Sequence, residues 1–473
     1  MRGQTLTDGN ISRQIWSLAW PIMLSFFFQN AYNLVDALWV GRLSGNALAA
    51  VNVSQITLFI VVSLGLGITV GSGVLISMAI GAGEKEKAEK ILGQSFVLSA
   101  VLAVLFSVIA LTFRSSFLSM SGAAGAILPL ALDYFTVVSA GSILLFLLIV
   151  IVFAFNSQGD NKTVTILFAV STGINIILDP ILIFGWLGAP ALGIAGAAYA
   201  TLFSQFVMLL VGLLLLSSPK MMIRFRFQNI GARWKSVKHV LSIGFPAAMT
   251  QVLGPLSLAL LYQVISSKFM EAGVAGISIG FRVETFAFLP GIGFGTAAMA
   301  IIGQNVGAGN IIRAREAYRK AALYAFWAGT GIGLLSVIFS GPIAASFTED
   351  TVIFGYASSY LRSVPLLYGL LGLMFVSISS FQATGKSWPG FWILLVRGIL
   401  MVGGSILLLT FISENIFTVW GAIILGTAAA AAAAFFSLQG RFNKLMKGNE
   451  HQNSGFIEIK SAETKAAINA QPV

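Results

Sequence analysis

The sequence predicts an all-α integral membrane protein with twelve transmembrane helices in two pseudo-symmetric six-helix lobes. Three observations carry this prediction: 57% of the 473 residues are hydrophobic and only 10% are charged, long apolar stretches separate the charged residues, and the two halves of the chain repeat one another. Soluble domains carry about 25% charged residues. The composition therefore excludes an ordinary soluble enzyme, a disordered chain and a nucleic-acid-binding domain.

The gaps between charged residues define the spans. A helix needs about 20 apolar residues to cross a bilayer, and we expect twelve such helices at 14–38, 47–80, 93–113, 129–155, 162–184, 192–217, 238–266, 276–306, 318–341, 357–384, 388–411 and 416–437. The domains follow as a cytoplasmic N-terminus (1–13), an N-lobe (14–217), a basic cytoplasmic linker (218–237), a C-lobe (238–440) and a disordered cytoplasmic tail (441–473). The first span is too long for a signal peptide, so we expect it to be retained.

The distribution of lysine and arginine among the loops predicts how the chain is oriented in the membrane. With both termini in the cytoplasm, 22 of the 28 basic residues lie on the cytoplasmic side. The net charge of +11 then reflects topology and not a nucleic-acid partner. We expect a monomeric, multi-pass protein of a bacterial or archaeal cytoplasmic (inner) membrane, with the lipid bilayer as its surroundings.

The two halves match at an offset of 225 or 226 residues. The matches are Trp20-Pro21 with Phe245-Pro246, Gly65 and Gly67 with Gly291 and Gly293, Gly81-Ala82-Gly83 with Gly307-Ala308-Gly309, Tyr134 with Tyr360, Phe155 with Phe381, Gly159 with Gly385, and Gly196 with Gly421. Because each half has six spans, the halves share one topology and their pseudo-axis lies along the membrane normal. This is a transporter architecture; a duplicated scaffold without a transport role is the alternative.

Asp36 closes the first span, where a carboxylate is costly and marks a functional candidate. Gln29, Tyr32, Asn33 and Asp36 fall on one helical stripe, which we expect to face the protein interior. Pro21, in the middle of the same span, permits a kink. That kink is either a hinge that responds to Asp36 or a static feature.

Asp179 lies in the fifth span, four residues after Asn175 and just before Pro180. Pro180 lacks an N–H and frees the carbonyl of Ile176, so several oxygens share one helical turn. In the sixth span Thr201 can add a hydroxyl. An all-oxygen cluster suits a proton or a hard monovalent cation. Burial favours the neutral form of a carboxyl group, and a bound cation favours its charged form. A buried carboxyl can therefore exchange a proton for a cation, which is the basis of antiport. The alternative role of Asp36 and Asp179 is that of structural hydrogen-bond anchors.

Three further charges lie close to or within spans. Arg282 and Glu284 open the eighth span and are interpreted as a paired interfacial couple, with cavity lining as the alternative. Arg397 lies near the middle of the eleventh span and has no assigned partner.

These motifs resemble the multidrug and toxic compound extrusion (MATE) family over about residues 14–440. The matching motifs are Pro21, Gln29-Asn30, Asn33, Asp36, Val40-Gly41, Gly81-Ala82-Gly83, Asn175 with Asp179-Pro180, Gly193-Ile194-Ala195-Gly196, Arg282-Val283-Glu284, Phe288-Leu289-Pro290-Gly291 and Gly303-Gln304-Asn305. The resemblance implies two six-helix lobes that export organic cations and amphiphiles against inward H+ or Na+.

The resemblance also implies a coupling site in the N-lobe. Family site residues carry over to Asp36, Asn175, Asp179 and Thr201, which are the candidate Na+ ligands, with Ala197 as a backbone ligand and Tyr32 beside the first carboxylate. One family branch has acids in the seventh and tenth spans. Here Gly254 occupies the first of these places and the tenth span has no acid, so the chain resembles the DinF-like branch.

Two rival functions differ in their chemistry. A lipid-linked saccharide or lipid flippase of the related superfamily would line its cavity with several basic residues for pyrophosphate. A membrane-embedded enzyme would need a histidine and carboxylate cluster. His239 stands at the very start of the seventh span and His451 in the tail, so we expect neither histidine within the membrane. With no cysteine, thiol chemistry is excluded as well. We therefore expect no enzyme and no cofactor, only H+ or Na+ as the coupling ion.

Overall fold

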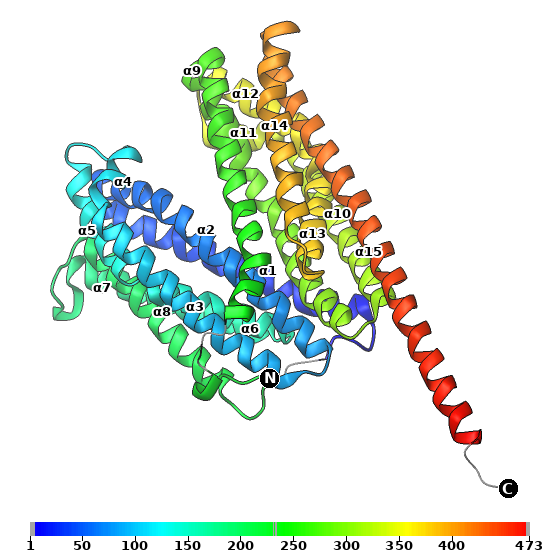
Figure 1. Cartoon of the computed structure of the whole chain (residues 1–473). Coiled ribbons are helices and arrows are strands. Elements are labelled where there is room, and N and C mark those ends of the chain that lie inside the picture. The colour runs from blue at the N-terminus through cyan, green and yellow to red at the C-terminus, as the bar shows by residue number, and fades with distance from the viewer. Residues whose placement is uncertain (1–4, 230, 232–233, 470–473) are drawn as a thin grey trace.

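The computed structural model describes residues 5–229, 231 and 234–469, in which helices make up nearly all of the chain and no strand occurs (Figure 1). The first lobe contains α1 (Ile11–Leu43), α2 (Gly45–Gly81), α3 (Lys85–Thr112), α4 (Arg114–Met120), α5 (Ile127–Ala140), α6 (Ser142–Ser157), α7 (Asn161–Phe184), η1 (Trp186–Gly188) and α8 (Ile194–Leu216). After η2 (Phe227–Asn229), the second lobe contains α9 (Trp234–Gly307), α10 (Ile311–Ile338), α11 (Ser340–Phe347), α12 (Thr351–Ser363), η3 (Val364–Leu367), α13 (Tyr368–Ala383), α14 (Trp388–Phe411) and α15 (Ile416–Asn469).

The described helices account for the twelve expected spans. Eight helices are long and apolar enough to cross a membrane, and α5 with α6, bent by 50°, makes a ninth. One of the eight, α9, is interrupted at Met270, where φ is +53°, and therefore contains two spans. Helices α1 and α2, which are not among these eight, are 33 and 37 residues long. They supply the last two of the twelve expected spans.

The glycines of the internal repeat end helices at equivalent turns. Gly83 and Gly309, which follow α2 and α9, have φ of +74° and +77°, and Gly159 and Gly385, which follow α6 and α13, have φ of +73° and +76°. Side chains disfavour this left-handed region and glycine enters it freely. The repeat in the sequence is thus a repeat of turn geometry.

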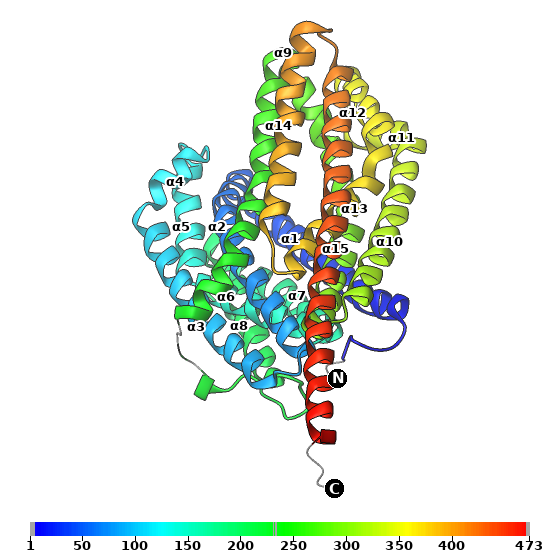
Figure 2. The same cartoon turned by 45° about the vertical axis from the view of Figure 1, so that its right-hand side comes forward.

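The two lobes meet at the end of the molecule where both termini lie, which we call the termini end, and splay apart at the other end (Figures 1 and 2). Two repeat-equivalent contacts hold them there. A Cβ on Gly81 would lie 1.8 Å from the carbonyl oxygen of Gln304, and a Cβ on Gly307 would lie 2.0 Å from that of Met78. Only glycine permits this close approach of α2 and α9.

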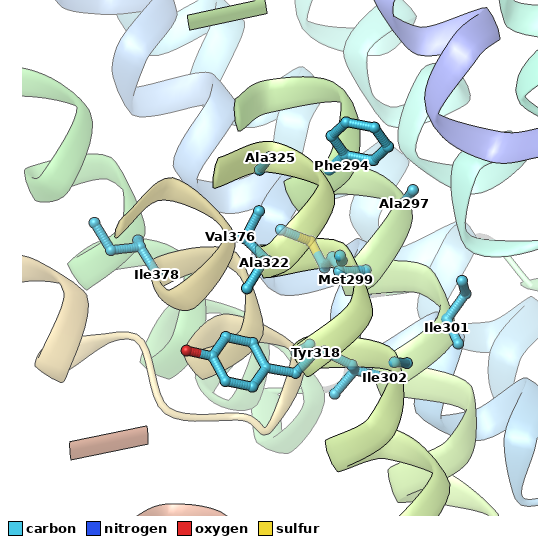
Figure 3. Close-up of a cluster of buried hydrophobic side chains, with 14 of the residues drawn as sticks. Phe294, Ala297, Met299, Ile301, Ile302, Tyr318, Ala322, Ala325, Val376 and Ile378 are labelled. Atoms are coloured by element: carbon cyan, nitrogen blue, oxygen red, sulfur yellow. The ribbon is translucent and has the colours of Figure 1, made fainter. Parts of the chain in front are cut away.

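A large apolar core crosses the boundary between the lobes. Side chains of α9, α10 and α13 form its centre (Figure 3), and the first half of α1 packs on them although α1 belongs to the other lobe. Trp16, for example, meets the ring of Phe294 edge to face, with the centroids 5.0 Å apart. Helix α1 is therefore in contact with both lobes along its first half.

The segment before α1 is anchored at the termini end. Leu6 is fully buried; its N–H donates to Gln304 Oε1 at 2.9 Å and its carbonyl accepts from Asn305 Nδ2 at 3.0 Å. Gln304 Nε2 also donates to the carbonyl of Ser157, at 2.8 Å. The Gln304-Asn305 motif therefore joins the N-terminal segment and both lobes. Helix α1 begins at Ile11, three residues before the predicted boundary, and residues 1–4 lie outside the described residues.

The basic linker folds back onto the first lobe. Arg226 Nε lies 3.3 Å from Glu89 Oε2, and the backbone N–H of Ile223 donates to Gln158 Oε1 at 3.0 Å. Residues 230, 232 and 233 of the predicted linker lie outside the described residues.

The expected disordered tail needs a correction. The structure continues α15 as a helix to Asn469, well beyond the predicted end of the last span. Phe442 is fully buried, and Arg441 Nη2 donates to the carbonyl of Thr384 at 3.2 Å. These contacts hold the helix against the C-lobe, so 441 is not a boundary. Residues 470–473 lie outside the described residues.

Candidate functional site

The two intramembrane acids of the first lobe are both buried. Asp36 is 2% exposed on α1 and Asp179 is fully buried on α7. Asn175 Nδ2 donates to Asp179 Oδ1 at 3.0 Å, as expected for side chains one helical turn apart. Helices α1 and α7, which carry the two acids, are joined by the hydrogen bond from Thr165 to the carbonyl of Pro21, so the structure places on neighbouring helices the acids that the sequence singles out.

Three oxygens at this site make no hydrogen bond. They are Asp36 Oδ1, Asn175 Oδ1 and Asp179 Oδ2. Buried polar atoms are normally satisfied, and exceptions need an explanation. An all-oxygen set with two carboxylates offers acceptors for a proton or a monovalent cation.

The remaining predicted site residues surround the acids. Tyr32 Oη lies 2.6 Å from Thr201 Oγ1, which joins α1 to α8, and Thr201 and Ala197 are both buried. On the polar stripe of α1, Asp36 is buried, whereas Gln29 and Asn33 are exposed. For Gln29 and Asn33 the expectation that the stripe faces the protein interior stays a prediction.

Sequence reasoning missed two residues beside the acids. Tyr134 on α5 is buried, feels the charges of Asp36 and Asp179, and hydrogen-bonds to Gln55 on α2. Tyr134 carries a signal in the sequence, since it is one of the repeat matches. Gln55 carries none, because only the packing of α2 on α5 brings it to the site.

Pro21 is held by helix α7. Thr165 Oγ1 donates to the carbonyl of Pro21 at 2.7 Å, and Asn161 Nδ2 donates to that of Leu18 at 3.1 Å. Helix α1 runs without interruption through Pro21. The region around the proline is thus tied to the helix that carries Asp179, which gives a physical connection between the candidate hinge and the candidate ion site.

The structure separates Arg282 from Glu284. Glu284 is 1% exposed and accepts a hydrogen bond from Tyr360 Oη at 2.5 Å, whereas Arg282 is exposed. The interfacial couple is therefore a wrong interpretation, because residues two apart on a helix point to nearly opposite faces.

The exposed face of α9 that carries Arg282 points to the first lobe. A Cβ on Gly293, eleven residues along α9 and three turns away, would lie 2.6 Å from Met23 Cγ on α1. Positions eleven apart share one face of a helix. Arg282 consequently lies on the side of the C-lobe that faces the N-lobe, which agrees with the alternative that it lines the cavity.

Arg397 has a partner that the sequence did not reveal. Its Nε donates to Thr427 Oγ1 at 3.1 Å, between α14 and α15, and the side chain is half-buried.

The comparison with known families explains the repeat and the fold together. The MatE family model matches residues 21–181 and again residues 246–407. The chain belongs to the MatE family. Its two matches correspond to the two lobes and have the same offset as the repeat, which confirms the predicted family, while the DinF-like branch stays a prediction. MatE proteins are membrane transporters and not enzymes.

Several relatives extend the comparison. The chain is 28% identical to an FAD transporter of Shewanella oneidensis, over 84% of this chain and 88% of the relative. It is 26% identical to the probable multidrug resistance protein NorM of Thermotoga maritima, over 80% of this chain and 81% of the relative. A crystal structure of MATE in the bent conformation matches with a TM-score of 0.89 and 26% identity, over 95% of this chain and 99% of the other. These matches confirm the twelve-helix fold.

Proposed function

We propose that this MatE protein is a secondary active multidrug exporter that moves organic cations or amphiphiles in antiport with H+ or Na+ by alternating access. The observation that carries the proposal is the pair of buried carboxylates, Asp36 and Asp179, with three oxygens that make no hydrogen bond. Charged groups are rare in the membrane interior and mark ion pathways there. The similarity to NorM of Thermotoga maritima supports drugs as the cargo.

The arrangement of charge supports the direction of transport. The positive-inside rule places the termini end in the cytoplasm, in a bacterial or archaeal inner membrane. Because the lobes touch at the termini end and splay at the other, this conformation opens away from the cytoplasm. An ion from outside would therefore reach the N-lobe acids in this state.

Ion uptake would act on the substrate through helix α1. A proton on Asp36 or Asp179, or a Na+ ion held by Asp36, Asn175, Asp179 and Thr201, removes net negative charge from the site. Helix α1 carries Tyr32 and Asp36 and is tied to α7 through the carbonyl of Pro21. A change of charge would shift the packing of α1 on α7, bend α1 near Pro21 and alter the wall of the space between the lobes.

The proposal is tested with purified protein in lipid vesicles. Ethidium movement is measured under an imposed proton gradient, under an imposed sodium gradient, and with no gradient. We expect transport in response to one of the two gradients, which identifies the coupling ion. Equal movement under all three conditions would contradict antiport.

A second substrate class is favoured by one observation. Arg282 is exposed on the face of α9 that points to the first lobe, and the relative from Shewanella oneidensis is named for FAD. A guanidinium group pairs well with phosphate, so we propose flavin dinucleotides as alternative cargo. Export of FAD from loaded vesicles by the wild type, and its loss in Arg282→Gln with ethidium transport retained, would support this alternative.

A further inference from the structure

The segment before helix α1 is bound to the C-lobe, and the proposed function gives this contact no role. Leu6 is fully buried, in the apolar core that α9, α10 and α13 form. Its N–H donates to Gln304 Oε1 at 2.9 Å, and its carbonyl accepts from Asn305 Nδ2 at 3.0 Å. Both amide side chains lie on α9, so residues 5–10 are attached to α9 by backbone hydrogen bonds and by a buried side chain.

A second contact binds the segment to α10. Arg313 Nη2 donates to the carbonyl of Asp8 at 2.8 Å and to Gln14 Oε1 at 3.0 Å. Gln14 Nε2 donates to the carbonyl of Asp8 as well, at 2.7 Å. Leu6 and Asp8 are therefore both held by the C-lobe, at the termini end of the molecule.

Helix α1, which continues the segment, is hydrogen-bonded to α7 of the N-lobe. Side chains of α7 donate to backbone carbonyls of α1, in the pairs Asn161 with Leu18, Thr165 with Pro21 and Thr172 with Phe28. The first half of α1 meets the C-lobe through apolar contacts such as that of Trp16 with Phe294. Because a polar group inside a bilayer finds no water to replace a lost partner, we expect α1 to stay with α7 when the lobes move.

The two attachments conflict whenever the termini end opens. The segment is tied to α9 and α10, whereas the helix that follows it is tied to α7 on the other lobe. Gln304 strengthens the closed end directly, since its Nε2 donates to the carbonyl of Ser157 on α6 at 2.8 Å. Opening this end must therefore break the bond between Gln304 and Ser157 and pull the segment away from the C-lobe.

The segment is built so that it can leave while α1 stays folded. Gly9 has a φ of +79°, which glycine adopts freely, and it turns the chain just before the helix. Asn10 Oδ1 accepts from the N–H of Arg13 at 3.0 Å and so caps the first turn of α1. The bonds that the segment loses lie at the termini end, outside the expected first span, where water can replace them.

We propose that residues 5–10 are a latch, which holds the termini end closed in the conformation described here and leaves its site on α9 and α10 each time that end opens. The strength of the latch then sets the balance between the two conformations of the transporter. The proposal rests on the proposed function in one respect: it takes the termini end to open during transport.

The first test locks the latch with a cross-link. The chain has no cysteine, so Asp8→Cys and Arg313→Cys introduce the only two thiols, and a short, reducible bifunctional thiol reagent joins them. We expect gradient-driven ethidium transport in vesicles to fall to background after cross-linking and to return after reduction. The two single-cysteine variants, treated with the same reagent, are the controls and are expected to keep their transport. Transport by the cross-linked protein at the rate of the unlinked protein would overturn the proposal.

The second test weakens the latch and follows the lobes without a transport assay. Spin labels on cysteines introduced as Lys85→Cys in α3 and Ile312→Cys in α10, both at exposed positions, report in lipid nanodiscs whether the termini end is open. Leu6→Ala is expected to raise the ratio of open to closed molecules about tenfold, because part of a buried leucine contact is lost. Thr7→Ala, which removes a hydroxyl that lies 3.4 Å from the carboxylate of Asp8 within the segment, is the matched control and should leave the ratio unchanged.

An unchanged ratio in Leu6→Ala would overturn the latch, because it would show that the segment stays in its site in both conformations. If Leu6→Ala does not fold, Asn305→Leu, which removes the donor to the Leu6 carbonyl, takes its place with the same two outcomes. Ethidium movement that is equal under every gradient would contradict the proposed function, whereas the spin-label ratio would still decide the latch.

Discussion

The N-lobe site and the buried Glu284–Tyr360 pair of the C-lobe lie at related places in a duplicated fold. Each contains a buried tyrosine at a repeat-equivalent position, Tyr134 in one lobe and Tyr360 in the other. The N-lobe site has two buried acids, Asp36 and Asp179, and the C-lobe pair has one, Glu284. Duplication preserved the tyrosine, and the buried acids diverged.

Under the proposed function this difference gives the lobes different roles. Two buried like charges destabilise one another and favour uptake of a proton or a cation, so ion exchange is expected in the N-lobe. The following experiments test how far this asymmetry extends.

Replacing the first-helix acid should have the largest effect. Asp36→Asn cannot take up a proton and weakens any cation site, so we expect gradient-driven ethidium efflux to fall to background while membrane insertion is retained. Glu284→Gln in the other lobe should keep most of the transport. Asp133→Asn, at an exposed position on α5, is the matched control. Full drug resistance in cells that carry Asp36→Asn would refute the coupling role.

The equivalent tyrosines should differ in their contribution to stability. Tyr360→Phe removes the one hydrogen bond to a buried carboxylate, and such bonds to charged groups contribute about 1.5–3 kcal/mol. Tyr134→Phe removes a bond to the neutral Gln55, for which about 0.5–1.5 kcal/mol is expected. Thermal unfolding in detergent measures both.

Tyr356→Phe is the control for the tyrosine comparison, since it lies on α12 one turn before Tyr360 and its hydroxyl makes no hydrogen bond among the described residues. A larger loss for Tyr134→Phe than for Tyr360→Phe would contradict an ionised Glu284 as the acceptor of the Tyr360 hydrogen bond.

The contact between the lobes should tolerate no added methyl group at its symmetric glycines. Gly81→Ala and Gly307→Ala each push a Cβ into a backbone carbonyl of the other lobe, and overpacking of this kind costs about 1–3 kcal/mol. We expect similar losses for the two variants and a shift away from contact at the termini end, measured by spin-label distances across it. Gly331→Ala, where a Cβ meets open space, should not destabilise the protein. Strongly unequal losses would show that the two contacts are not equivalent.

Removing one partner of an exposed ion pair should have the smallest effect on transport and stability. The hydrogen bond from Lys268 lowers the pKa of the Glu414 carboxyl, which lies between α14 and α15. A lowered pKa means that the pair stabilises the folded state at neutral pH and that this contribution disappears as the pH falls through the lowered pKa. We expect Glu414→Gln to leave transport unchanged and to alter the unfolding temperature slightly, at neutral pH only. A large loss of transport would show that this charge belongs to the machinery.

The sequence predicted the N-lobe site better than the buried Glu284–Tyr360 pair of the C-lobe for a physical reason. Asp36 and Asp179 stand alone in long apolar stretches, and Asn175 lies one turn from Asp179, so local spacing reveals them. Glu284 and Tyr360 are 76 residues apart and meet only when α9 packs on α12. Glu284 also has Arg282 close by in sequence, which favoured an interfacial couple over burial.

The tail and the inter-lobe contact show the same limit. The predicted tail from residue 441 is polar and mixed in charge over most of its length, yet Phe442 packs into the core. No local pattern reports a contact with a distant helix. Gly81 and Gly307 were visible as a repeat, but their role as the place where two helices touch depends on the pairing of α2 with α9.

The sequence by itself determined the class of protein, the number of spans, the duplication and the identity of the N-lobe acids. It did so because a bilayer requires continuous apolar helices and makes every charge within them conspicuous. Only the tertiary structure decided which polar groups meet these charges, because that depends on which helix faces pack together. The packing of α9 on α12 brings Tyr360 to Glu284, while one oxygen each of Asp36, Asp179 and Glu284 is left without a hydrogen bond.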